Sequence, residues 1–171
     1  FVWELTPILA IYLGLMLSYV LLFRRFIILD VFCIGLGFML RVIAGGVVIG
    51  IPISPWLYVC TASGAFLIAL IKRRSELLSA GVNAVQQRPI LGEYSVELID
   101  RLVAVVAPTT LMAYTLYSFS GSFLENVNIP DNNSMMLTVP FVAYGLFRYL
   151  YLGYRTDRGE APEELLFRDP A

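Results

Sequence analysis

The stretch ILDVFCIGLGFMLRVIAGGVVIGI, residues 28–51, carries only two charged side chains, Asp30 and Arg41, in 24 positions. A helix needs about 20 apolar residues to cross about 30 Å of hydrocarbon, so this stretch is long enough to span a membrane. In lipid the backbone must satisfy its own hydrogen bonds, and the run is too continuous for a barrel strand. We therefore predict a membrane-spanning helix here.

Four further apolar runs accompany this one, at residues 5–23, 55–71, 102–119 and 135–154. Hydrophobic residues make up 58% of the chain and charged residues 15%, with a mean hydropathy of +0.76. A soluble domain carries more charge and less apolar surface, so the balance indicates lipid as the solvent. The predicted fold class is an all-α membrane protein, a single domain with about five transmembrane helices.

The links between these runs alternate in charge. Lys and Arg occur in the link after the first run, in residues 72–94 and in the tail 155–171, but not in residues 50–54 or 121–134. Because cytoplasmic links are enriched in Lys and Arg, this alternation predicts that the chain starts outside and ends in the cytoplasm. Residues 72–94 are predicted as a cytoplasmic loop and 155–171 as a cytoplasmic tail.

Several kinds of chemistry are excluded by composition. The chain has no histidine, which rules out a histidine triad, histidine-ligated metals and imidazole acid–base catalysis. Its two cysteines, Cys33 and Cys60, lie inside apolar runs without zinc-type spacing and are interpreted as packing thiols. A phosphate-binding glycine loop of the Walker type is also absent from the sequence.

Asp30 and Arg41 share one face of the predicted helix at residues 28–51. Their eleven-residue separation is almost three turns, about 16 Å along the axis, which places Arg41 near the bilayer centre. A charge at that depth costs about 3 kcal/mol and usually lines a cavity or pairs with another charge. We favour a cavity open to the cytoplasm; the alternative is a structural ion pair with another helix.

A second group of charges, Lys72-Arg73-Arg74-Ser75-Glu76, follows the third run. On a continuing helix Lys72 and Arg73 share a face with Glu76, at spacings of four and three. Such a cluster suits a polyanion, with the carboxylate available to a metal ion that bridges phosphates. The alternative is a set of basic residues that marks the membrane surface.

Local patterns around these charges predict further features. Leu78, Val82 and Val85 form an apolar stripe typical of an interfacial helix, and Ser95 with Glu97 indicates the N-cap and first turn of the next helix. Small residues recur at a spacing that lets helices approach closely. They are Ala10, Gly14 and Ser18 in the first run, and Gly46 and Gly50 in the second.

Several stretches together resemble the decaprenyl-phosphate phosphoribosyltransferase family of UbiA-type intramembrane prenyltransferases. The matching stretches, in order, are LRVIAGG at 40–46, PISPW at 52–56, KRRSEL at 72–77, RPIL at 88–91, YS at 94–95, GEAPEE at 159–164 and RDP at 168–170. No single stretch is decisive, but the ordered set covers nearly the whole chain.

The resemblance implies a magnesium-dependent transferase with a cytoplasm-facing polar cavity. In that family, magnesium-bound phosphoribosyl diphosphate reacts with a polyprenyl phosphate, releasing diphosphate and leaving a ribosyl phosphate on the lipid. By resemblance Lys72, Arg73 and Glu76 are catalytic, and Glu76 is also a magnesium ligand. The implied substrate-binding residues are Arg41, Arg88 and Tyr94. Asp30 is a further candidate for substrate binding because of the helix face it shares with Arg41.

Two departures from the family pattern stand out. Arg74 occupies a position where the family usually has tyrosine, and the Asn-Asp-x-x-Asp motif of the superfamily is absent from these 171 residues. The resemblance to a nine-helix bundle leads us to expect about three further spans before Phe1 and one after Ala171. We therefore expect one part of a two-motif active site.

Two further interpretations stay open. The chain would be a catalytically inactive, prenyltransferase-like membrane subunit of a larger complex, or a transporter that uses the face shared by Asp30 and Arg41 as a substrate path. The expected location is the inner, cytoplasmic membrane of a prokaryote. Expected partners are membrane lipid, a polyprenyl lipid and phosphoribosyl diphosphate, with no nucleic acid; a membrane-protein complex and a homo-oligomer are both left open.

Overall fold

The computed structural model describes residues 2–26, 28–87, 94–119 and 134–155. Within these ranges every regular element is a helix, which confirms the all-α prediction. The elements are α1 (Val2–Leu21), η1 (Phe23–Arg25), α2 (Leu29–Ile49), α3 (Pro55–Gln87), α4 (Val96–Phe119), η4 (Ser134–Thr138) and α5 (Val139–Arg155).

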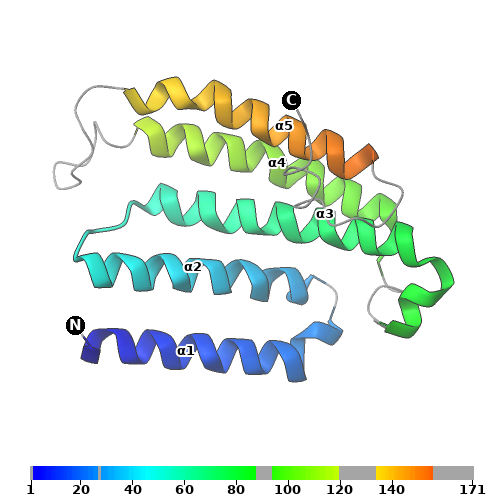
Figure 1. The fold of residues 1–171 in the computed structure, drawn as a ribbon, viewed down its shortest axis with the longest axis horizontal. Coiled ribbons are helices and arrows are strands. Elements are labelled where there is room, and N and C mark those ends of the chain that lie inside the picture. Colours follow the sequence, from blue (N-terminus) through cyan, green and yellow to red (C-terminus); the bar gives the residue numbers. More distant parts are fainter. Residues whose placement is uncertain (1, 27, 88–93, 120–133, 156–171) are drawn as a thin grey trace.

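The five α-helices lie side by side in chain order and alternate in direction (Figure 1). α3 packs most extensively on α4, and α5 contacts both of them. As a result η1, the C-terminal part of α3 and the end of α5 gather at one end of the row, whereas the link between α2 and α3 lies at the other (Figure 1). The described parts of the segments predicted to be basic are therefore brought to the same end.

Four helical segments in the described residues are long and apolar enough to cross a membrane. They are Leu29–Ile49, Pro55–Leu78, Val96–Phe119 and Met135–Arg155. The apolar part of α1, Leu5–Leu21, is shorter. These segments correspond to the five predicted runs, so the structure supports an integral membrane protein of four to five spanning helices.

The segment at residues 72–94, predicted as a cytoplasmic loop, is helical to Gln87, beyond the end of the hydrophobic run at residue 71. α3 runs for 33 residues from Pro55 to Gln87, and in Figure 1 its last turns bend away from the row. Charged Lys, Arg and Glu residues end a hydrophobic run but are good helix formers, so the backbone continues as a helix through them. Leu78 is exposed, as the interfacial stripe requires; the side chains of Val82 and Val85 lie outside the described residues.

The fourth helix also begins earlier than the hydrophobic run at 102–119 indicates. α4 starts at Val96, and the Oγ atom of Ser95 accepts a hydrogen bond from the N–H of Leu98 at 3.1 Å. The N-cap predicted at Ser95 is therefore confirmed. A serine in this position satisfies one of the free N–H groups of the first turn.

The buried core lies at the contact between α3 and α4, near the end where the basic segments gather. Leu67, Leu70, Ile71, Ile99 and Val103 are almost completely buried there. In contrast, many large apolar side chains on α1, α2 and α5 face outward. An apolar outer surface of this extent suits helices surrounded by lipid rather than water.

Candidate functional site

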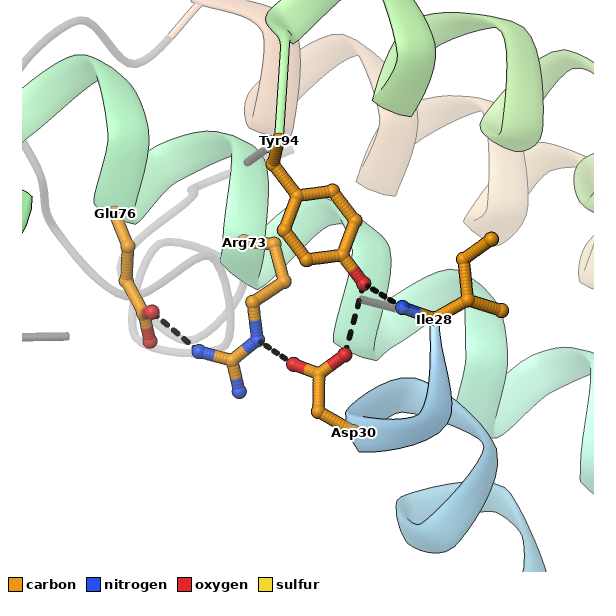
Figure 2. Close-up of polar contacts among 5 residues, drawn as sticks. All are labelled: Ile28, Asp30, Arg73, Glu76 and Tyr94. Atoms are coloured by element: carbon orange, nitrogen blue, oxygen red, sulfur yellow. Dashed lines mark hydrogen bonds and ion pairs between the residues drawn. The ribbon is translucent and has the colours of Figure 1, made fainter. Parts of the chain in front are cut away.

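Four polar residues from three segments meet beside this core. Asp30 comes from the first turn of α2, Arg73 and Glu76 from α3, and Tyr94 from the segment just before α4 (Figure 2). We call these four side chains the polar cluster. Their convergence depends on the antiparallel packing of α2, α3 and α4, because Asp30 and Tyr94 are 64 positions apart in the sequence.

Asp30 is the buried centre of the polar cluster. Its side chain has no exposed surface, and its Oδ2 atom lies 3.1 Å from Nε of Arg73. Its Oδ1 atom accepts a hydrogen bond from the hydroxyl of Tyr94 at 2.8 Å (Figure 2). Its place in the first turn of α2 also puts the negative charge at the positive end of the helix dipole.

Arg73 is held between two carboxylates. Only 3% of its side chain is exposed, and Nη1 donates to Oε2 of Glu76 while Nε faces Asp30. Glu76 is 31% exposed and lies at the edge of the polar cluster. Arg73 therefore fixes the position of Glu76, and its charge is already matched within the protein.

Lys72 occupies a different face of α3 from Arg73. Successive helical residues are about 100° apart, and Lys72 is exposed where Arg73 is buried. The two cations predicted as one motif therefore have different surroundings. Their catalytic roles, and that of Glu76, stay predictions.

Tyr94 joins two segments through its hydroxyl group. The hydroxyl accepts a hydrogen bond from the N–H of Ile28 at 2.7 Å and donates to Asp30 (Figure 2). Burial raises the pKa of the Tyr94 phenol, and the neighbouring Asp30 raises it further, whereas the N–H of Ile28 acts in the opposite direction. The hydroxyl therefore stays protonated and keeps its role as a donor to Asp30.

Arg41 does not share the surroundings of Asp30, although the two lie on the same stripe of α2. Arg41 is exposed, and its Nη2 atom donates to the hydroxyl of Tyr12 on α1 at 2.6 Å. Its guanidinium also lies 5.4 Å from the ring centre of Tyr12 and 5.0 Å from that of Phe38. Asp30 thus forms the ion pair considered as the alternative, rather than lining an open cavity with Arg41; binding roles for both residues stay predictions.

An apolar groove of about 490 Å³ begins at the polar cluster and follows α2, α3 and α4. Phe32, Phe66 and Val105 are among the side chains along it, and Tyr94 and Ile28 also line it. The Tyr94 ring therefore belongs to the groove, and its hydroxyl belongs to the polar cluster. No pattern in the sequence predicted this groove, because its wall is assembled from three helices.

The magnesium ion expected from the resemblance stays a prediction, for which the described residues contain no complete ligand set. Within them, no group of three or more acidic, cysteine or histidine side chains lies together. Magnesium is often held by one or two carboxylates together with substrate phosphates, so Glu76 at the cluster edge fits a single ligand position. The predicted anion-binding Arg88 and the tail at 156–171 lie outside the described residues.

This chain is similar to curated proteins that carry the name of the family expected from the sequence. The chain is 30% identical over 165 residues to the decaprenyl-phosphate phosphoribosyltransferase of Corynebacterium glutamicum, covering 96% of this chain and 48% of that protein. It is 28% identical to the protein of that name from Mycolicibacterium smegmatis, covering 97% and 53%. The predicted resemblance is confirmed.

The likeness concerns part of a UbiA-type phosphoribosyltransferase. The protein of the same name from Mycobacterium tuberculosis is 27% identical, with 98% of this chain and 54% of that protein covered. The chain thus spans about half the length of the curated relatives it matches. No protein-family model matches this chain.

Arg74, the departure from the usual phosphoribosyltransferase pattern, has a structural partner in this chain. Its Nε atom donates to Oδ1 of Asp100 on α4 at 2.8 Å, and its guanidinium lies 4.1 Å from the ring centre of Tyr154 on α5. Arg74 is 11% exposed and Asp100 is 36% exposed. This contact ties three helices together, and the sequence did not reveal it because neither Asp100 nor Tyr154 belongs to a local pattern with Arg74.

Replacing Arg74 with Met is expected to lower the free energy of unfolding by about 2 kcal/mol, because the substitution leaves Asp100 without its charged partner. Asp100→Asn should have a similar effect, and the double variant should cost less than the sum of the two. Denaturant titration in detergent micelles measures all three. Arg101→Met is the control, since Arg101 and Glu97 are 77% and 74% exposed. Strict additivity of the two changes would contradict the contact.

Proposed function

We propose that this chain contributes the lipid groove and one polar motif of a phosphoribosyltransferase at the cytoplasmic membrane face. Its donor would be phosphoribosyl diphosphate and its acceptor a polyprenyl phosphate. The observation that supports this most is the junction at Tyr94, where the apolar groove meets the polar cluster. A lipid phosphate has the same two-part character, with an apolar tail and an anionic head.

The groove suits the tail of the acceptor. It is lined almost entirely by apolar side chains and lies on helices that are long enough to span a membrane. An isoprenoid tail gains about 25 cal/mol for each Å² of apolar surface removed from water, but in a membrane its transfer from lipid is nearly neutral. The groove would therefore orient the tail, and the charged groups would supply affinity for the head.

The transfer needs charge stabilisation more than covalent catalysis. The bond between C1 of the ribose and the diphosphate oxygen breaks, and an oxygen of the lipid phosphate forms the new bond to C1. A magnesium ion held by Glu76 and the donor phosphates would supply neutralisation of the leaving diphosphate. Arg73 would orient Glu76, while Lys72, Arg41 and Arg88 are the remaining candidates for contact with the anions.

The sharpest test replaces Glu76 with Gln in the full-length protein in membrane vesicles. Glutamine can still accept a hydrogen bond from Arg73, so folding should be retained, but its weaker metal binding should reduce transfer by about 100-fold. The assay follows phosphoribose transfer from phosphoribosyl diphosphate to a polyprenyl phosphate across a magnesium titration. Higher magnesium should restore part of the rate.

The control for this test is Glu97→Gln, which removes the same charge from an exposed pair outside the polar cluster. Its transfer rate should match that of the unchanged protein. Full transfer by Glu76→Gln would remove Glu76 from the site. Absence of transfer by the unchanged protein would overturn the proposed function and favour an inactive membrane subunit.

A further inference from the structure

Ile28 adopts an unusual backbone conformation at the start of α2. It has a positive φ of 68°, which no other non-glycine residue in the described part of the chain shows. A β-branched side chain is strained in this region, because Cβ crowds the neighbouring carbonyl groups. Strained residues of this kind persist only where surrounding contacts hold them, and they are frequent at functional sites.

The hydroxyl of Tyr94 holds this strained residue. It accepts the N–H of Ile28 at 2.7 Å and donates to Asp30 two positions later (Figure 2). Asp30 in turn faces Arg73, and Arg73 donates to Glu76. A chain of direct contacts therefore connects one phenol to the carboxylate at the exposed edge of the polar cluster.

Tyr94 also lines the apolar groove. Both the Tyr94 and Ile28 side chains line the groove, close to Val31 and Leu70. A tail that fills the groove must therefore contact the residue that organises the polar cluster. Displacing the ring would loosen its hydrogen bonds to Ile28 and Asp30, whereas packing against it would secure them.

We propose that Tyr94 is a positioning residue that couples occupation of the apolar groove to the geometry of Asp30, Arg73 and Glu76. An isoprenoid tail against the Tyr94 ring holds its hydroxyl on Ile28 and Asp30, and thereby fixes Glu76 for the magnesium-bound donor. This inference rests on the proposed function, because it assigns lipid to the groove and the diphosphate donor to the polar end. It predicts that the two substrates bind cooperatively.

The test measures donor binding without polyprenol and at rising mole fractions of polyprenol up to saturation of the effect, because polyprenol has the isoprenoid tail but neither the acceptor phosphate nor the affinity that this head supplies. The full-length protein in nanodiscs is titrated with phosphoribosyl diphosphate in the presence of magnesium. Coupling between sites typically changes affinity by about 5- to 150-fold, so polyprenol should lower the donor Kd at least about fivefold. In Tyr94→Phe, which keeps the ring but loses both hydrogen bonds, the ratio of the two Kd values should fall close to one.

This ratio separates coupling from a merely structural role. A variant that only damages the fold would weaken donor binding in both conditions and leave the ratio unchanged. Tyr144→Phe is the matched control, because Tyr144 is exposed on α5 and lines neither the groove nor the polar cluster. It should retain the ratio of the unchanged protein.

A second variant covers the case in which Tyr94→Phe does not fold. Adding Ile28→Gly relieves the positive-φ strain, while the bond to Asp30 remains lost, so the ratio should still be close to one. If polyprenol leaves the donor Kd of the unchanged protein the same, this inference alone is overturned. The inference would also be overturned if Tyr94→Phe or the double variant showed the same ratio of donor Kd values, without and with polyprenol, as the unchanged protein. Failure of the unchanged protein to bind donor would overturn the proposed function as well.

Discussion

Asp30→Leu is expected to lower the free energy of unfolding by about 3 kcal/mol, because the change leaves Arg73 buried without its partner on α2. Arg73 is only 3% exposed, so water cannot take the place of the lost carboxylate. The loss lies at the lower end of the range for broken buried pairs, since Glu76 remains bonded to Arg73. The Tyr94 hydroxyl also loses its acceptor.

The double variant Asp30→Leu/Arg73→Met makes this prediction specific. Replacing both members of a buried ion pair with apolar residues is often neutral, so the double variant should recover most of the lost stability. Its transfer activity should stay low, because Glu76 is no longer held. Denaturant titration in mixed micelles and the vesicle assay give the two readouts.

The exposed pair of Arg101 and Glu97 provides the comparison for this result. Glu97→Gln should change the free energy of unfolding by less than about 0.5 kcal/mol, because exposed ion pairs contribute little. A double variant no more stable than Asp30→Leu would mean that the ion pair itself, rather than burial of an unpaired charge, carries the effect. Such a result would contradict the expected cost of leaving Arg73 buried without Asp30.

Gly35→Ala is the second change with a large expected effect. A Cβ atom at Gly35 would lie 2.1 Å from Cε1 and 2.7 Å from Cδ1 of Phe66, so the whole ring must move. The ring lines the apolar groove and lies 4.8 Å from that of Phe32. We expect a loss of about 1–3 kcal/mol in the free energy of unfolding, as for other overpacked cores.

Gly45→Ala in the same helix is the matched control, because nothing lies within 4 Å of the added methyl group. Alanine is favoured over glycine inside a helix by up to about 1 kcal/mol, so the two substitutions should change stability in opposite directions. Unfolding titrations of both variants measure the difference. Adding Phe66→Leu to Gly35→Ala should restore part of the loss; a destabilisation that persists in full would place the clash elsewhere.

The glycines also show where local patterns stop being informative. The small-residue spacing drew attention to Gly14, yet nothing lies within 4 Å of a Cβ built there. The close approaches are at Gly35 against Phe66, Gly37 against Met16, Gly46 against Ile53 and Gly153 against Ile71. Only Gly46 among these glycines belongs to the predicted spacing. Which face of a helix meets its neighbour depends on the rotation of the helix in the bundle, and several faces of an apolar helix look alike in the sequence.

The sequence indicated the residues of the candidate site, but it did not predict which of them contact one another. Asp30 stood out as a charge inside an apolar run, where charges are costly. Arg73 and Glu76 were named from the group of charges after the third run, and Tyr94 only from the family resemblance. Their pairing was not predicted, since Asp30 meets Arg73 and Tyr94 only when α2, α3 and α4 pack together. The contact of Arg74 with Asp100 was missed for the same reason.

By itself, the sequence determined the helical fold class, the approximate spanning segments, the end of the bundle that gathers the basic residues, and the N-cap at Ser95. These properties follow from hydropathy, charge order and capping, which act between residues near each other in the chain. Only the tertiary structure decided that α3 continues to Gln87, that Arg73 is buried between two carboxylates and that Tyr94 lies where an apolar groove meets the polar cluster. These features depend on helix length, rotation and packing, and the stretch at residues 28–51 acquires its ion pair only through the helices beside it.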